Sequence, residues 1–471
     1  MAGDGTDHET EHLHDLIQRS EPADSVAVEP RNYTGWVFLW LLFGFLIFNG
    51  LRATFADKPD KEKKHTAQEL MLRQAVYSKR LAELSPLKAG NLDSGFESVA
   101  KAVEEDGKSS PAAALLYAEA YQEMGKRPPL PYLSTLLRSD NAEYKALSQL
   151  YASEKLSDGA AQRLTKSIES DSFPFELAKV HAREKAGLTP SGRDAIAPLW
   201  KAIAVAGVLL ALGLISLLGI AVWVTFVALR SSGHISPLGF PEGNITPAYA
   251  DRLALRAAQI VAAFLLFEFV AAIVNRMGLN RMVAGLIAPI GVLVFVFVIQ
   301  RVPVTGRLIT LADMGIRGGR LGKDVVWGVC AFAAEIPLMA LLGLVGRKIF
   351  SFLPDPEHPA STLLQNRPDI GIVISVLVFG ALIAPFWEEI AFRGLMFPAI
   401  SKVTWGPVAG ALISSLIFAA IHPQGPTTWL ALGSIAAVSC ALAYHTKSLV
   451  PSIVMHALHN FALLLGTLIL F

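Results

Sequence analysis

The residues best suited to chemistry are Glu388, Glu389 and Arg393, three charged side chains within an apolar stretch that begins at Ile370. One ionised residue at the centre of a membrane helix costs roughly 2.5 to 3.5 kcal/mol, so charges kept there usually face a protein or water cavity. Positions four apart share one helix face, so we expect Glu389 to pair with Arg393. Glu388 then points elsewhere, and a poorly solvated carboxylate without a counter-charge has the proton affinity that a general base needs.

Two later apolar stretches carry histidines that would complete a site. His422 ends the run that includes Phe418, and His456 stands four positions before Asn460 on one helix face. A carboxylate base, a histidine that holds water and a histidine–amide pair that donates to an oxyanion are sufficient to add water to a peptide carbonyl. Glu388, His422 and His456 are equally the ligand types of a catalytic zinc, so no cofactor is certain and Zn²⁺ stays open.

The order EExxxR, FxxxH and HxxxN on successive apolar segments resembles the CAAX protease and bacteriocin-processing family (CPBP, Abi) of intramembrane endopeptidases. The resemblance covers roughly residues 311–471 and includes Met314-Gly315-Ile316-Arg317, which is similar to the amphipathic lead-in of these proteins. It implies a protease that acts on a membrane-associated peptide or protein. The site residues that it implies are Glu388, Glu389, Arg393, His422, His456 and Asn460.

The resemblance leaves the substrate and the metal open. Family members cleave prenylated C-terminal tails in eukaryotes and other membrane-associated peptides in bacteria, where the location would be the plasma (inner) membrane. The family was named for metal dependence, but an asparagine paired with His456 suits an oxyanion better than a metal ion. We therefore favour a glutamate-driven site, with Glu388, His422 and His456 as the ligands if a zinc is present.

The composition is that of a polytopic membrane protein. Of 471 residues, 52% are hydrophobic and 17% charged, and the mean hydropathy is +0.44. A net charge of +1, without a basic run interleaved with aromatics, indicates no nucleic-acid partner. Cys330 and Cys440 lie in apolar runs and are expected to be small buried hydrophobes. We predict an all-α, multi-pass integral membrane helix bundle in contact with the lipid bilayer.

Nine apolar stretches are expected to enter or cross this bilayer. The stretch at 370–400 should be kinked or interrupted near Pro385, because proline lacks the backbone N–H of a regular helix. The others are 34–51, 200–229, 253–274, 282–299, 325–345, 407–421, 428–444 and 449–471.

The predicted domains follow from these stretches. Residues 1–33 are expected to be a disordered acidic tail, residues 34–52 a transmembrane helix and residues 53–198 a soluble helical domain. Residues 199–310 would form further transmembrane helices, and residues 311–471 the protease core. His8, His12 and His14 could bind a metal weakly, but a solvated tail is the preferred interpretation.

The inserted helical domain shows a spacing of thirty residues. Tyr117, Leu147 and Leu177 begin similar patterns, and Tyr117-Ala-x-x-Tyr121-x-x-x-Gly125 is similar to the first helix of a tetratricopeptide repeat. An irregular helical bundle is an equal alternative. Under either interpretation the domain would bind a protein partner or the substrate, or regulate the enzyme.

Two other classes of function remain open. A transporter or proton relay also keeps carboxylates in the membrane, but it would be expected to have paired broken helices in two related halves, and only one copy of EExxxR is present. A catalytically silent scaffold acting through the helical domain is the third class, and the completeness of the motifs argues against it. A structural role is assigned to Glu268, Glu335, His445 and His459, of which Glu335 is the residue to check as a cavity-lining group.

Overall fold

The computed structural model describes residues 29–55, 65–83, 93–235, 245–278, 281–316, 320–353 and 370–470. Helices make up their regular structure, and the one β contact among them is an isolated bridge between Val304 and Arg307. The all-α prediction is therefore confirmed. The acidic tail before Glu29, with its three histidines, and the lead-in residue Arg317 lie outside the described residues.

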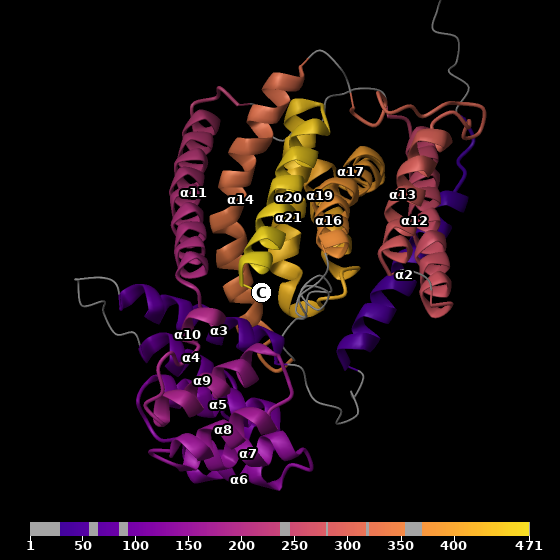
Figure 1. Cartoon of the computed structure of the whole chain (residues 1–471). Coiled ribbons are helices and arrows are strands. Elements are labelled where there is room, and N and C mark those ends of the chain that lie inside the picture. Colours follow the sequence, from indigo (N-terminus) through magenta and orange to yellow (C-terminus); the bar gives the residue numbers. More distant parts are fainter. Residues whose placement is uncertain are drawn as a thin grey trace, which may run out of the picture.

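Long apolar helices form the upper part of the molecule in Figure 1. Within the described residues, seven helical segments are long and apolar enough to cross a membrane, and two shorter apolar helices accompany them. All nine predicted stretches fall on these segments, so the protein is an integral multi-pass membrane protein. The long segments are α2 (Thr34–Phe55), α11 (Leu199–Ser231), α12 (Pro247–Arg276), α14 (Leu321–Ile349), Ile370–Val403, Pro426–Thr446 with α20 (Trp429–Thr446), and α21 (Val450–Leu470); the shorter ones are α13 (Arg281–Ile299) and α19 (Pro407–Ala420).

Residues Ile370–Val403 do not form one regular helix. The path consists of α16 (Ile370–Val378), the π-helix η2 (Phe379–Ile383), α17 (Ala384–Glu389), the π-helix η3 (Ile390–Met396) and α18 (Phe397–Val403). The predicted interruption near Pro385 is therefore a pair of π segments on either side of α17. Short π segments inside α-helices occur frequently at functional sites, because they shift side chains out of the regular register.

Shorter helices gather beneath one end of the bundle (Figure 1). Three of them, α5, α7 and α9, carry the thirty-residue spacing seen in the sequence, and each alternates with a partner helix along the chain. Serine and asparagine side chains cap these helices, as when Ser110 accepts a hydrogen bond from Ala113 N. The tetratricopeptide-like interpretation stays a prediction. The helices are α3 (Thr66–Ala82), α4 (Asp93–Ala102), α5 (Pro111–Glu123), α6 (Leu130–Arg138), α7 (Ala142–Ala152), α8 (Asp158–Ser167), α9 (Phe173–Lys185) and α10 (Arg193–Ile196).

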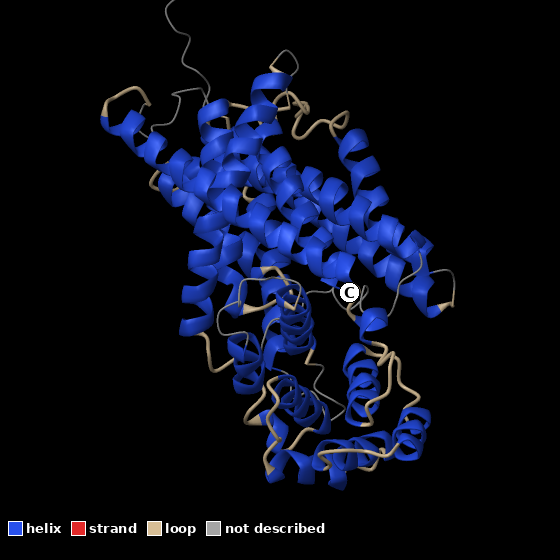
Figure 2. Cartoon of the chain, turned by 60° about the vertical axis from the view of Figure 1, so that its left-hand side comes forward, coloured by secondary structure: helices blue, strands red, loops and turns tan. Residues whose placement is uncertain are grey.

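The hydrophobic core of these shorter helices continues into the bundle. Ala202 and Val205 of α11 belong to the same buried cluster, and Ile469 near the end of α21 packs against it. Figure 2, turned by 60°, shows the helical domain in direct continuity with the ends of the long helices. The predicted boundary at Pro198 lies at the N-cap of α11, and the buried cluster extends across it.

A buried carboxylate joins three elements of this domain. Glu123 is fully buried and contacts His181 Nε2 at 3.0 Å, Lys79 Nζ at 2.9 Å and Arg193 Nη1 at 2.8 Å. Burial alone would raise the pKa of Glu123, but the hydrogen bond from His181 and the charges of Arg193 and Lys79 outweigh it and hold the pKa well below its ordinary range. This carboxylate therefore ties α3, α9 and α10 together immediately before the chain enters α11.

The first membrane helix is fixed to α12 by Asp251. This carboxylate is 2% exposed and accepts hydrogen bonds from Arg31 Nε at 2.7 Å and Trp36 Nε1 at 2.8 Å. Gly35 allows the close approach, since a Cβ there would lie 2.4 Å from the backbone nitrogen of Leu255. Further along α2, the ring of Phe43 lies 5.7 Å from the ring of Phe392 in η3, measured between centroids.

Candidate active site

The side chain of Glu389 contacts two others, those of Arg393 and His456. Its Oε1 lies 3.0 Å from Arg393 Nη1, and both side chains are fully buried. The i,i+4 contact expected from the sequence is therefore present, although Arg393 belongs to a π segment. His456 Nδ1 lies 3.0 Å from the same oxygen across 67 residues of sequence, a contact that helix spacing could not predict.

Glu388 points away from that ion pair. Its side chain is 17% exposed, whereas the side chain of Glu389 is fully buried. Glu388 Oε2 lies 3.8 Å from His456 Nε2, beyond the length of a direct hydrogen bond. The imidazole of His456 thus stands between two carboxylates, held by Glu389 through Nδ1 and turned toward Glu388 through Nε2.

His422 follows the C-terminal end of α19 and reaches this region beside Phe418. Its Nδ1 contacts the backbone oxygen of Phe418 at 2.5 Å, and because a carbonyl only accepts, Nδ1 is the donor. The ring of Phe418 lies 4.6 Å from the ring of His422 and 5.9 Å from that of His456, measured between centroids. The guanidinium of Arg393 lies 4.4 Å from the same aromatic ring. Phe418 therefore holds the two histidines and the arginine around one side chain.

Asn460 makes a contact that differs from the expected one. Its Nδ2 donates to the backbone oxygen of Gly380 at 2.7 Å, in the π segment η2. In a π segment a backbone N–H bonds to the carbonyl five residues before it, which for position 385 is the carbonyl of Gly380, and Pro385 has no N–H to donate. The amide of Asn460 therefore supplies this carbonyl with a donor.

A zinc site would require Glu388, His422 and His456 to converge on one ion. Among the described residues, no group of three or more His, Cys, Asp or Glu side chains is placed to hold a metal ion. His456 Nε2 lies 3.8 Å from Glu388 Oε2 and His456 Nδ1 contacts Glu389, an arrangement that a metal-bound histidine also has. The chemistry proposed below uses no metal in any step.

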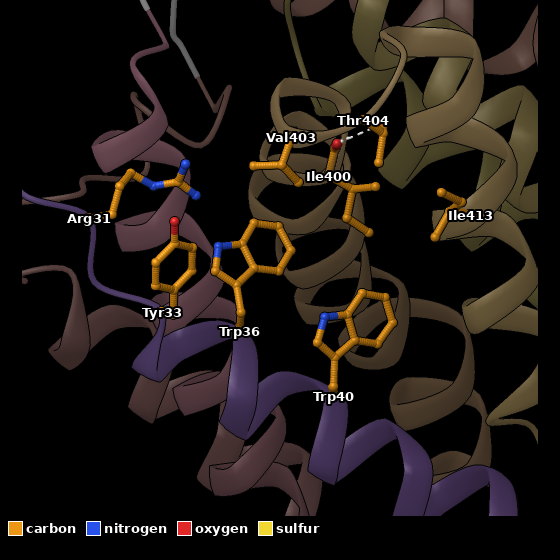
Figure 3. A pocket seen from close by; sticks show the side chains of 8 residues that line it. All are labelled: Arg31, Tyr33, Trp36, Trp40, Ile400, Val403, Thr404 and Ile413. Atoms are coloured by element: carbon orange, nitrogen blue, oxygen red, sulfur yellow. Dashed lines mark hydrogen bonds between the residues drawn. The ribbon is translucent and has the colours of Figure 1, made fainter.

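A cavity of about 250 Å³ lies elsewhere in the bundle and contains none of the predicted site residues. Figure 3 shows its walls: Arg31, Tyr33, Trp36 and Trp40 from the start of α2 on one side, and Ile400, Val403, Thr404 and Ile413 on the other. Tryptophan and tyrosine side chains are typical of the membrane–water interface. We attribute this cavity to the membrane surface of the bundle rather than to the polar site.

One buried polar contact beside the site was not predicted from the sequence. Glu335 of α14 lies 2.9 Å from His459 Nδ1 of α21, with both side chains almost completely buried. The sequence indicates Glu335 as the carboxylate to check and assigns a structural role to His459. The pairing joins residues 124 positions apart, so no local pattern could have revealed it.

The arrangement defines a class of protein: a multi-pass membrane protein with a carboxylate–histidine site among its helices. Residues 370–462 match the family model described as "Type II CAAX prenyl endopeptidase Rce1-like", so this part of the chain is an Rce1-like domain. The resemblance seen in the sequence motifs is thereby confirmed, and the family is one of membrane CAAX endopeptidases.

Part of the chain is also similar to a bacterial protein. An Escherichia coli protein described as "Uncharacterized 24.3 kDa protein" is 34% identical over 115 residues. The match covers 24% of this chain and 50% of that relative, so the chain spans about half the length of the relative. No solved structure matches the chain.

Proposed function

We propose that the protein is an intramembrane endopeptidase that hydrolyses a peptide bond through a water molecule activated by Glu388. The observation that carries this proposal is the different environment of the two adjacent glutamates. Glu389 is engaged by Arg393 and His456, while Glu388 is partly exposed and faces His456 Nε2. A carboxylate close to an imidazole but without a bound cation is suited to accept a proton from water.

The proposed reaction begins with Glu388 taking one proton from water as the water oxygen attacks the carbonyl carbon of the peptide. His422, whose Nδ1 is fixed by a backbone oxygen, orients the water through its Nε2. In this proposal both ring nitrogens of His456 carry a hydrogen, so that Nδ1 donates to Glu389 while Nε2, with the second N–H of Asn460, donates to the developing oxyanion. Collapse of this intermediate breaks the C–N bond, and the proton held by Glu388 passes to the leaving amine.

Glu389 and Arg393 have a positioning role in this proposal. The carboxylate of Glu389 accepts from His456 Nδ1, which fixes the ring and directs Nε2 toward the reacting carbonyl. The buried charge of Arg393 neutralises Glu389 and so keeps that carboxylate from competing for the catalytic proton.

The proposed substrate is a peptide or protein held at the membrane, with a prenylated C-terminal tail as the first candidate because the matching family is described by that substrate. We propose that residues 311–471 form the protease core and that the helical domain at residues 53–198 binds the substrate or a protein partner. In a bacterial host the location would be the plasma (inner) membrane.

Terminal profiling of membrane proteins tests the function and does not require the substrate to be identified first. Cells carrying the wild type are compared with cells carrying Glu388→Gln. New peptide termini that need Glu388, with accumulation of the uncut precursor in the variant, are the expected result. Identical terminal profiles would refute the peptidase proposal and return the transporter and scaffold classes to first place. An internally quenched peptide built on the cleaved sequence then serves as the reporter peptide.

A further inference from the structure

A second carboxylate–histidine pair uses His459, which stands between His456 and Asn460 on α21 but is not one of the motif positions. Glu335 Oε1 on α14 is 2.9 Å from His459 Nδ1 on α21, and the two side chains are 0% and 3% exposed. Within the described part of the chain, neither oxygen of Glu335 nor Nδ1 of His459 has a hydrogen bond of good geometry. The short contact between Glu335 Oε1 and His459 Nδ1 therefore brings together two groups that have no other hydrogen-bond partner in that part of the chain.

Stability alone does not account for this pair. Ionisable side chains are rare in membrane segments and usually serve a function there. Replacing a buried ionic pair by well-packed apolar residues is often neutral or stabilising. Glu335 and His459 stand in helices that are otherwise strongly apolar, so an apolar pair would be the simpler way to join α14 and α21.

The position of His459 on α21 relates the pair to the site. His456 and His459 are three residues apart, which places their side chains roughly 60° apart around the helix axis. Each histidine directs Nδ1 to a carboxylate on a different element: His456 to Glu389 of α17, and His459 to Glu335 of α14. One such contact fixes where α21 lies, and two contacts on adjoining faces also fix its rotation.

Close packing of α14 against α21 transmits this constraint. A Cβ added at Gly328 of α14 would lie 2.7 Å from the backbone oxygen of Pro451 and from the Cβ of Val454. The two backbones therefore touch near the start of α21, and the polar pair adds a second point of attachment further along the same two helices.

We propose that Glu335 and His459 are a positioning pair for the reaction proposed above, on which this inference rests. The pair sets the rotation of α21 and so directs His456 Nε2 toward Glu388, 3.8 Å away. Neither Glu335 nor His459 exchanges a proton with the substrate. Their effect on the reaction passes through the orientation of His456.

The experiment compares purified variants on the reporter peptide. Glu335→Leu and His459→Leu remove the polar contact. They are expected to lower kcat about tenfold to a hundredfold, which is the effect of displacing a catalytic group by about 1 Å, while KM stays unchanged. Glu335→Gln keeps the shape of the side chain and a polar oxygen next to His459 Nδ1, so it is expected to retain most of the wild-type kcat. Glu268→Leu and His445→Leu, polar residues of other membrane helices, are matched controls expected to leave kcat unchanged.

Hydrogen–deuterium exchange across α21 gives a readout that does not depend on catalysis. Both leucine variants are expected to exchange faster than the wild type in α21, and Glu335→Gln to match the wild type. Leucine variants with wild-type kcat and wild-type exchange would overturn the inference. A parallel fall of kcat and melting temperature in Glu335→Gln would also overturn it, because the pair would then only hold the fold together. If Glu388→Gln leaves cleavage intact, the proposed role of Glu388 as the base fails, and exchange alone still decides whether the pair orders α21.

Discussion

Replacing the adjacent glutamates one at a time should separate a structural carboxylate from a catalytic one. Glu389→Gln removes the negative charge that lies 3.0 Å from both Arg393 Nη1 and His456 Nδ1. The Gln oxygen can still accept from His456, but the fully buried guanidinium of Arg393 loses its counter-charge. Removing one partner of a buried ion pair costs about 3 to 5 kcal/mol, so this variant should lose stability first and activity as a consequence.

Glu388→Gln should have the opposite profile. Its side chain is 17% exposed, and its contact with His456 Nε2 is 3.8 Å long, so the amide leaves no fully buried charge unpaired. We expect the free energy of unfolding to change by about 1 kcal/mol or less. Loss of the base should lower kcat by about 10²- to 10⁴-fold.

Both variants are purified in one detergent beside the wild type and the control Glu268→Gln. Melting temperature is followed by tryptophan fluorescence, and kcat is measured with the reporter peptide. A stable, inactive Glu389→Gln together with a normally active Glu388→Gln would show that the two roles are inverted.

Three further outcomes are expected. A fragment of residues 53–198 should be soluble and helical by circular dichroism. Extension of the fragment to residue 206 should raise its melting temperature, because Ala202 and Val205 complete its core. An unfolded extended fragment would show that the domain boundary is wrong. Cleavage of the reporter peptide should survive chelators, and one bound zinc per chain whose removal abolishes cleavage would contradict the proposed mechanism. Burial and the neighbouring Glu69 and Glu123 carboxylates raise the pKa of Glu119 well above its ordinary 4.5. The folded domain therefore keeps a proton that the unfolded chain releases. As a result, the stability of the domain falls as pH rises above 4.5 toward the raised pKa. In urea unfolding, Glu119→Gln should therefore have a larger free energy of unfolding than the wild type near pH 7, and no larger one near pH 4. The same difference between variant and wild type at both pH values would exclude the link between the pKa of Glu119 and stability.

The membrane helices could be predicted from the sequence because composition within a window of about twenty residues decides whether a segment enters a bilayer. The pairing of Glu389 with Arg393 was equally accessible, since it depends on helix spacing. Both predictions use information that is local in the chain.

The remaining contacts of the site are not local. His456 meets Glu389 across 67 residues, and Asn460 meets Gly380 across 80. The motif predicted that these side chains belong together but not which atom faces which. Pro385 indicated an interrupted helix, yet the form of the interruption, two π segments around α17, depends on how neighbouring helices supply the displaced backbone groups with partners.

Helix α21 explains why these distant contacts converge. It directs three polar side chains to three different elements: His456 to α17, His459 to α14 and Asn460 to η2. Its far end reaches the helical domain, where Ile469 packs against the buried cluster. A helix held by polar contacts at several points has little freedom to rotate or slide, because each displacement would leave buried polar groups without partners. The contacts of α21 with α17, α14, η2 and the helical domain therefore constrain where His456 lies as much as its contact with Glu389 does.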